Sequence, residues 1–292
     1  MEISNPDKEL FGSPDGFALT KLGLAKYYQS VASTMLPYLA DRPISMQRFP
    51  DGIGEAGFYE KKAPAHFPRW VDTVKVETAD NMQSQVVISD QRSLVYLADQ
   101  GCITPHAWLS RAKALDRPDQ LMFDLDPSVD DDVDKVQTAT SMTGEILDEL
   151  GLTSFVKTTG SRGYHVVVPL RQRESFNETR QFASEVADVL VGRAPDLLTT
   201  EHRKDDRGDK VYIDVARNGY GQTAVPPYAV RPLPGAPVAA PIEWYEVAGV
   251  SPGEFTVENI GNRLSRRGDA WHGMRRRAHG LDRARDKLTR LR

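Results

Sequence analysis

The chain has 292 residues, of which 40% are hydrophobic and 27% charged, and its net charge is −4. Its single cysteine, Cys102, excludes an intramolecular disulfide framework and a cysteine zinc site, and we expect a buried thiol there. No apolar run is long enough to span a membrane and the first residues lack a secretion signal, so a cytoplasmic protein is expected.

The first half of the chain begins with a predicted helix. Thr20 is expected to cap it, and the helix is expected to end at Pro37 and the turn over 41–43. Its apolar face consists of Leu24, Tyr28, Val31 and Met35. Strands are predicted over 44–49, 85–88 and 101–108, a short helix over 93–98, and a loop or strand edge over 57–62.

The second half carries strands predicted over 121–127, 155–157, 164–170 and 211–215. Asp130, Asp131 and Asp132 offer a cap for a helix that Gly151 ends, and Ser175 with Glu178 resembles a capping box for another. The segments 202–209 and 225–241 are expected to be irregular, since the first is highly charged and the second is rich in proline and glycine. Strands and helices that alternate irregularly predict an α+β fold, with mixed central sheets flanked by helices.

Asp124 and Asp126 stand two residues apart in an apolar run that ends at Pro127. Side chains alternate faces along a strand, so both carboxylates point the same way. Neighbouring carboxylates repel each other and raise each other's pKa unless a cation lies between them, and oxygen ligands suit Mg²⁺ or Mn²⁺. Two exposed aspartates at the end of an edge strand would give the same pattern, so the pair alone is a weak signal.

A third carboxylate, Asp214, lies on the predicted strand over 211–215. Three aspartates are what a two-metal phosphoryl-transfer site needs, with metals ~3.5–4 Å apart that clamp the attacking and leaving oxygens. Between Asp126 and Asp214 lies the Gly-Ser-Arg-Gly-Tyr-His run over 160–165, whose glycines let backbone amides approach phosphate oxygens. A hairpin turn with a solvated arginine is the plainer interpretation, but its place between carboxylate strands favours a triphosphate site. Arg231 is a further phosphate candidate.

Charge is unevenly distributed along the chain. Residues 261–292 carry a net charge of +8, whereas the rest of the chain carries −12. A basic tail on an acidic body is a plausible nucleic-acid contact, and the alternative is a solvated surface helix. A helix or flexible arm that touches phosphates is expected, and packing of the tail on the acidic body is the competing possibility.

These motifs together resemble a known family. The matching stretches are 123–127 (Phe-Asp-Leu-Asp-Pro), 156–166 (Val-Lys-Thr-Thr-Gly-Ser-Arg-Gly-Tyr-His-Val) and 212–214 with Arg217-Asn218. They closely resemble the polymerase domain of bacterial ligase D, within the archaeo-eukaryotic primase superfamily. The likeness begins at 5–8, continues through 57–61 and 106–108, and reaches 263–264 and 268–271, so it covers nearly the whole chain.

The resemblance implies a DNA-repair nucleotidyltransferase of non-homologous end joining. Such domains add nucleotides, preferably ribonucleotides, to primer 3′ ends at short gaps and double-strand-break ends, with Mn²⁺ or Mg²⁺ in a two-metal site. Ku and a DNA ligase acting in trans would be partners beside gapped DNA with a 5′ phosphate and nucleoside triphosphates, and the protein would work at the nucleoid.

The resemblance also implies roles for individual residues. The catalytic metal ligands would be Asp124, Asp126 and Asp214. The nucleotide would be bound by His106, Ser161, Arg162, His165 and Arg231. DNA would be bound by Lys8 and Lys21 at the 5′ phosphate and by Phe58 and Tyr59 stacking on the template, at ~1–3 kcal/mol per base.

The sequence departs from the family pattern in three places. Arg162 replaces a lysine, so a planar fork replaces a point charge, and Tyr59 replaces a phenylalanine. The spacing from Lys8 to Lys21 is longer than in the family pattern. No Lys-x-Asp-Gly occurs, so we expect a free-standing polymerase without the adenylated lysine of a ligase.

The expected organisation is a single primase-polymerase catalytic domain over 1–272 and a basic tail over 273–292. Within the domain, 1–115 would bind DNA and the 5′ phosphate, and 116–250 would hold the metal and nucleotide site. Two other functions stay open at this point. One is a catalytically silent DNA-end binder, and the other is an Asp-x-Asp glycosyltransferase, which has no need of Asp214 or the basic tail.

Overall fold

The computed structural model describes residues 1–12, 16–78, 81–129 and 132–291. The chain divides into two compact units, each built from separate stretches of sequence. Unit 1 contains 1–115, 223–240 and 255–266, and unit 2 contains 116–222, 241–254 and 267–292. No helix in the described ranges is both long enough and apolar enough to cross a membrane.

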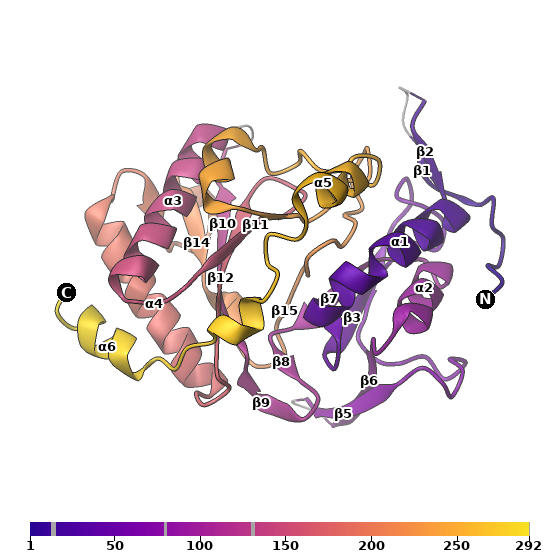
Figure 1. Ribbon diagram of the computed structural model, residues 1–292, viewed down its shortest axis with the longest axis horizontal. Coiled ribbons are helices and arrows are strands. Elements are labelled where there is room, and N and C mark those ends of the chain that lie inside the picture. Colours follow the sequence, from indigo (N-terminus) through magenta and orange to yellow (C-terminus); the bar gives the residue numbers. More distant parts are fainter. Residues whose placement is uncertain (13–15, 79–80, 130–131, 292) are drawn as a thin grey trace. The chain divides into compact units, whose positions relative to one another are not determined.

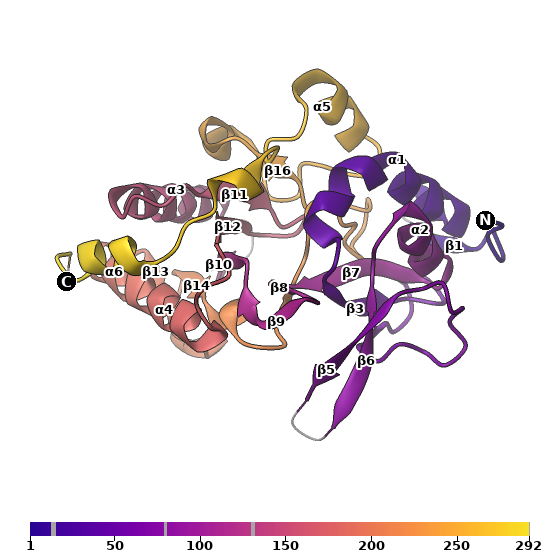
Figure 2. The same ribbon diagram turned by 60° about the horizontal axis from the view of Figure 1, so that its bottom comes forward.

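Unit 1 is centred on a sheet with the strand order β15-β7-β3-β6-β5, and β4 pairs with β3 outside this path. Ladders β3–β7, β3–β6 and β5–β6 are antiparallel, and Figure 2 shows β5 and β6 running side by side as a long hairpin. The strands are β3 (Pro43–Arg48), β4 (Phe58–Glu60), β5 (Thr73–Glu77), β6 (Met82–Val87), β7 (Cys102–Trp108) and β15 (Thr223–Ala224).

Two helices of unit 1, α1 (Lys21–Leu39) and α2 (Gln91–Asp99), pack against each other, and α2 also packs on β7 (Figure 1). A small antiparallel hairpin, β1 (Glu9–Gly12) and β2 (Ala18–Thr20), leads into α1. The buried tyrosines of α1 recruit a distant stretch of chain, since the Tyr27 hydroxyl donates to the Tyr228 carbonyl and the Tyr28 hydroxyl accepts from the Val230 amide. These bonds explain why 223–240 belongs to unit 1.

Unit 2 is built on a sheet with the order β13-β14-β10-β12-β11-β16 among the described residues. All of its ladders are antiparallel except β13–β14. Its strands are β10 (Gln120–Pro127), β11 (Phe155–Thr158), β12 (Tyr164–Pro169), β13 (Leu198–Thr199), β14 (Val211–Asp214) and β16 (Pro241–Ile242). A two-stranded ribbon, β8 (Ser110–Arg111) and β9 (Ala114–Pro118), lies where the chain passes from unit 1 to unit 2.

Helices α3 (Val133–Glu149) and α4 (Phe176–Arg193) pack against each other and against β10 (Figure 1). Along β10, Leu121, Phe123 and Leu125 are fully buried, while the two aspartates alternate with them and belong to the other face. One face of β10 therefore packs into the core, and the opposite face carries the two aspartates together with the buried Met122.

The C-terminal tail over 273–292 belongs to unit 2. Its helix α6 (Asp282–Leu288) contacts α4, whereas the preceding helix α5 (Ile260–Arg267) belongs to unit 1 up to residue 266. Leu281 and Leu288 are buried, and the Leu281 amide donates to a Glu174 carboxylate oxygen at 2.7 Å. The structure thus favours the second possibility for the tail, packing on the body, over a free arm.

The sequence-based predictions hold for most elements and fail in detail at others. The mixed α+β class, the strands, the Thr20 cap and the Ser175–Glu178 capping box are confirmed. The prediction that Pro37 ends the first helix is wrong, because Pro37 lies in the last turn and the helix continues to Leu39. Asp132 caps α3, whereas Asp130 and Asp131 lie outside the described residues. Cys102 is buried, and desolvation raises the pKa of its thiol to about 12.

Candidate active site

A row of polar residues crosses four strands of unit 2. Asp124 on β10 lies opposite Asp214 on β14 and opposite His165 on β12, and His165 in turn lies opposite Lys157 on β11. Directly paired residues of antiparallel strands share a face, so all four side chains belong to the same side of the sheet. Asp126, two residues on, shares that face with Asp124. The expected grouping of the three aspartates is therefore built into strand register.

Asp124 is buried, with only 6% of its surface exposed, and His165 is its nearest partner. The His165 Nε2 lies 3.1 Å from the Asp124 Oδ1. Desolvation alone would raise the pKa of Asp124, but His165, Arg217 and Lys157 outweigh it and lower the pKa to about 2. Desolvation, helped by the charge of Lys157, lowers the pKa of His165 to about 4. At neutral pH a neutral imidazole therefore donates to an ionised carboxylate.

Asp126 is in a different electrostatic state. Desolvation and then the charge of Asp124 raise its pKa to about 7, although Arg162 and Arg217 act in the opposite direction. The carboxylates of Asp124 and Asp126 therefore carry unequal charge at neutral pH. The negative charge of Asp124 disfavours ionisation of Asp126, and a bound cation would relieve this repulsion.

The glycine-rich turn between β11 and β12 is fixed by its own backbone. The Thr159 amide donates to the Gly163 carbonyl and the Gly163 amide donates to the Thr159 hydroxyl. A Cβ on Gly163 would lie 2.0 Å from the Leu125 carbonyl oxygen, so only glycine fits against β10. Gly160 has φ +66°, which also favours glycine. The turn thereby places Ser161 and the exposed Arg162 beside the aspartate row.

Two residues of this site received no role from the sequence. Arg217, in the 3₁₀ turn η2 (Ala216–Asn218), places its Nε 3.5 Å from an oxygen of Asp124 and 3.5 Å from an oxygen of Asp214. Lys157, at the β11 end of the row, is completely buried. The three-residue spacing from Asp214 to Arg217 was a usable signal, whereas a lysine in an apolar strand carries no signal of its partners.

The donor set suits a hard divalent cation, because it consists of carboxylate oxygens on adjacent strands. The side chains are not arranged for one as they stand: among the described residues no group of three or more Asp, Glu, His or Cys side chains could hold a metal ion. Arg217 gives the physical reason, since its guanidinium takes the position between Asp124 and Asp214. The residues present fit a metal once that guanidinium moves.

The remaining predicted nucleotide and template residues belong to unit 1. His106 is buried on β7, with its Nε2 3.1 Å from the Gln47 side-chain oxygen and its ring 5.3 Å from that of Tyr59. Phe58 and Tyr59 on β4 are 46% and 58% exposed, which suits stacking. Arg231 is partly exposed, and its amide donates to the Pro237 carbonyl. Gln47 is a partner that the sequence did not indicate.

The two predicted 5′-phosphate ligands differ sharply in their surroundings. The Lys8 Nζ is 2.6 Å from the Asp51 Oδ1, and the Asp51 side chain is 72% exposed. Lys21 is only 7% exposed, and its Nζ lies 2.8 Å from the Ser4 hydroxyl and 3.4 Å from the Asp99 carboxylate. Lys8 is available to a ligand if it leaves Asp51, whereas Lys21 is held in a buried cluster.

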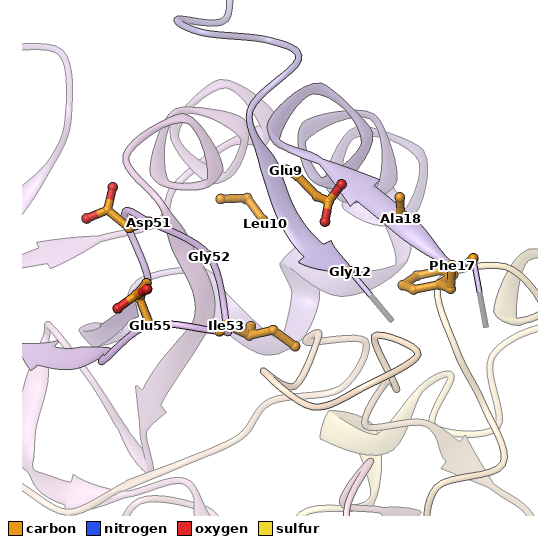
Figure 3. A pocket seen from close by; sticks show the side chains of 11 residues that line it. Glu9, Leu10, Gly12, Phe17, Ala18, Asp51, Gly52, Ile53 and Glu55 are labelled. Carbon is orange, nitrogen blue, oxygen red and sulfur yellow. The ribbon is translucent and has the colours of Figure 1, made fainter. Parts of the chain in front are cut away.

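A hollow of about 600 Å³ beneath the β1–β2 hairpin adjoins this ion pair. Figure 3 shows Glu9 on β1 and Asp51 and Glu55 on the 51–55 loop among its lining residues. An acidic lining repels phosphate, so this hollow does not itself suit a 5′ phosphate.

Comparisons with known proteins extend these observations. The family model described as "LigD, primase-polymerase domain" matches residues 20–271. The bifunctional non-homologous end joining protein LigD of Bacillus subtilis is 30% identical over 270 residues, which cover 92% of this chain and 43% of that protein. The multifunctional LigD of Mycolicibacterium smegmatis is 28% identical over 271 residues, covering 92% of this chain and 35% of its own length.

Solved structures give the same result. The polymerase domain from Mycobacterium tuberculosis ligase D in complex with DNA superposes with a TM-score of 0.87 at 26% identity, covering 96% of this chain and 99% of that one. The expected primase-polymerase core is thereby confirmed. The chain spans less than half the length of the curated relatives named above.

Proposed function

Because this chain belongs to the LigD primase-polymerase domain family, we propose that it is a nucleotidyltransferase that extends DNA 3′ ends at gaps and breaks. The observation that carries the proposal is the register of β10, β12 and β14, which sets Asp124, His165 and Asp214 opposite one another on one face. Two carboxylates paired across adjacent strands, with Asp126 beside them, form the oxygen-rich edge that nucleotidyl transfer requires.

We propose that Asp124, Asp126 and Asp214 hold divalent metal, Mn²⁺ or Mg²⁺, in a two-metal site. When bound, the metals would activate the primer hydroxyl and neutralise the leaving pyrophosphate. The residues themselves prepare this chemistry. His165 donates to the Asp124 Oδ1 and fixes the orientation of that carboxylate, and the Ala216 amide donates to the Asp214 Oδ1 at 2.7 Å.

The 160–163 turn is the proposed triphosphate contact. Ser161 supplies a hydroxyl and Arg162 an exposed guanidinium, whose planar fork pairs well with phosphate oxygens. His165 lies beside them, and its Nδ1 is buried without a hydrogen-bond partner among the described residues. That unpartnered atom supports a ligand role for His165 in addition to its bond with Asp124.

The DNA and remaining nucleotide contacts are proposed from the family pattern. Phe58 and Tyr59 would stack on template bases, and their exposure supports this. Lys8 and Lys21 would bind the 5′ phosphate. The exposed position of Asp51, the partner of Lys8, supports this role for Lys8, whereas Lys21 is buried. His106 and Arg231 are proposed nucleotide ligands in unit 1.

The biological setting is also a proposal. The relatives carry the name of non-homologous end joining proteins, and the solved structure is a complex with DNA. We propose that this chain acts in end-joining repair at the nucleoid, with a preference for ribonucleotides and with Ku and a ligase as partners.

A primed-gap assay tests the proposal. The wild-type protein should add nucleotides to a primer opposite a one- to three-nucleotide gap with a 5′ phosphate, faster with ribonucleotides than with deoxynucleotides, and only with Mn²⁺ or Mg²⁺ present. Binding of the gapped DNA without incorporation under any of these conditions would instead support the catalytically silent end binder.

A further inference from the structure

Arg217 is a cation that already bridges two carboxylates of the aspartate row. Its guanidinium Nε is 3.5 Å from the Asp124 Oδ2 and 3.5 Å from the Asp214 Oδ2, so one side chain bridges two carboxylates on neighbouring strands. Those carboxylates are only 9% and 14% exposed, whereas the Arg217 side chain is 41% exposed. The two carboxylates are thus largely buried in the site, whereas the Arg217 side chain reaches them from the solvent side.

The backbone beneath Arg217 is anchored independently of this bridge. The fully buried Asn218 accepts from the Met122 amide at 2.8 Å and donates to the Met122 carbonyl at 2.7 Å. A further bond, from the Asn218 side-chain amide to the Val215 carbonyl at 2.9 Å, closes the η2 turn. Only the side chain of Arg217 has to rotate for the guanidinium to leave the carboxylates.

We propose that Arg217 is the internal counter-ion of the metal-free site, and that a divalent metal must displace its guanidinium to bind Asp124 and Asp214. The inference rests on the proposed metal site and goes beyond it, because it makes Arg217 the residue that sets metal affinity. Arg217 stabilises the metal-free protein by neutralising two carboxylates, and by the same contacts it competes with the metal.

Linkage fixes the direction of the effect. Removing Arg217 leaves the carboxylate repulsion unrelieved in the metal-free state, so that state loses stability. The metal-bound state loses little, because the guanidinium has already moved. Metal affinity therefore rises on removal of Arg217, and the metal stabilises the variant by more than it stabilises the wild type.

The test measures Mn²⁺ binding to the whole protein by calorimetry, together with thermal melts in EDTA and in Mn²⁺. Arg217→Gln should melt at a lower temperature than wild type in EDTA, bind Mn²⁺ about tenfold more tightly, and show a larger rise in melting temperature on adding Mn²⁺. Arg217→Lys, which keeps a point charge, should lie between the two. The control is Arg193→Gln, which removes an exposed pair with Glu149 in the same unit and should leave Mn²⁺ affinity unchanged.

Two kinds of failure are distinguishable. Unchanged or weaker Mn²⁺ binding by Arg217→Gln, with normal binding by the wild type, overturns the counter-ion role and leaves the metal site intact. Wild-type protein that binds no Mn²⁺, or binds it equally well after Asp124→Asn, overturns the metal site and the counter-ion role with it.

Discussion

At the scale of single residues, two aspartates of the site differ in pKa although they are the same residue type. Asp124 and Asp126 share a strand and a face, yet the first has a pKa of about 2 and the second of about 7. The difference comes from their partners: desolvation opposes ionisation of both, but Asp124 alone has His165 as a hydrogen-bonding partner. A sequence shows the two aspartates and cannot show this difference, because it arises from register with β12.

The raised pKa of Asp126 predicts a pH effect on stability. A carboxyl whose pKa is higher in the folded state than the ordinary 3.8 binds protons more tightly when folded, so stability falls as pH rises from about 4 to about 7. His165, with a lowered pKa, contributes in the opposite direction over an overlapping window. Asp126→Asn removes the first contribution alone.

Asp126→Asn should therefore have the same free energy of unfolding as wild type near pH 4. At pH 7.5 its free energy of unfolding should be higher than that of wild type by on the order of 2 kcal/mol, after allowance for partial exposure. Urea titrations of the metal-free protein across this range measure the difference. A difference between the two proteins that does not change with pH would show that folding leaves the pKa of Asp126 at its ordinary value.

Lys8 gives a second prediction at this scale. Asp51 competes with any phosphate for the Lys8 amine, so Asp51→Asn should strengthen binding to gaps with a 5′ phosphate by about two- to fivefold and leave 5′-hydroxyl gaps unchanged. Lys8→Ala should weaken 5′-phosphate binding selectively. Fluorescence anisotropy on both substrates is the measurement, and Asp188→Asn, which neutralises an exposed carboxylate on α4 of unit 2, is the control. Parallel changes on both substrates would leave Lys8 as a solvated surface charge.

At the scale of elements, the turn between β11 and β12 approaches β10 so closely that position 163 has no room for a side chain. Gly163→Ala would force a Cβ against the Leu125 carbonyl and move the turn or the strand, at a loss of about 3 kcal/mol or more. Gly192→Ala in α4 meets no atom within 4 Å and should add roughly 0.5–1 kcal/mol of stability. Denaturant unfolding of both variants measures this contrast, and equal effects would contradict the close approach.

The sequence left two roles open for the basic C-terminal segment, namely packing on the body and contact with DNA phosphates. Its apolar residues pack on unit 2, so Leu281→Ala and Leu288→Ala should each cost about 2–4 kcal/mol and lower the melting temperature. Its exposed arginines at 275–277 would act on DNA: replacing them with glutamine should leave the melting temperature nearly unchanged. Each lost phosphate contact would flatten the slope of log K against log salt by roughly 0.9. A salt slope that stays the same would leave the segment with a structural role alone.

Local patterns predicted local structure well, for physical reasons. The Thr20 and Ser175 caps, the Asp124 strand and the Gly151 helix stop are fixed by hydrogen bonds and dihedral preferences within a few residues. Pro37 was mispredicted because a proline in a last turn removes one hydrogen bond and leaves the rest of a buried helix intact.

At the scale of the whole molecule, the connections that assemble the units are long-range. β15 returns to β7 after more than a hundred residues, and β16 returns to β11, so that each unit is discontinuous in sequence. No local pattern encodes such pairing. The three aspartates could be nominated from the sequence because their motifs resemble a family, whereas the contact of Arg217 with Asp124 on another strand and the burial of Lys157 could be found only in three dimensions.

The central claim is that the carboxylates on β10 and β14 hold the metal that nucleotidyl transfer requires. Single-turnover primer extension with Mn²⁺ compares wild type, Asp214→Asn and Glu149→Gln, the last neutralising an exposed carboxylate on α3. The account predicts a loss of several kcal/mol of transition-state stabilisation, a fall of roughly a thousandfold or more, for Asp214→Asn alone, with a cooperative thermal melt in EDTA as evidence of folding. Extension by Asp214→Asn at a rate near that of wild type would contradict it.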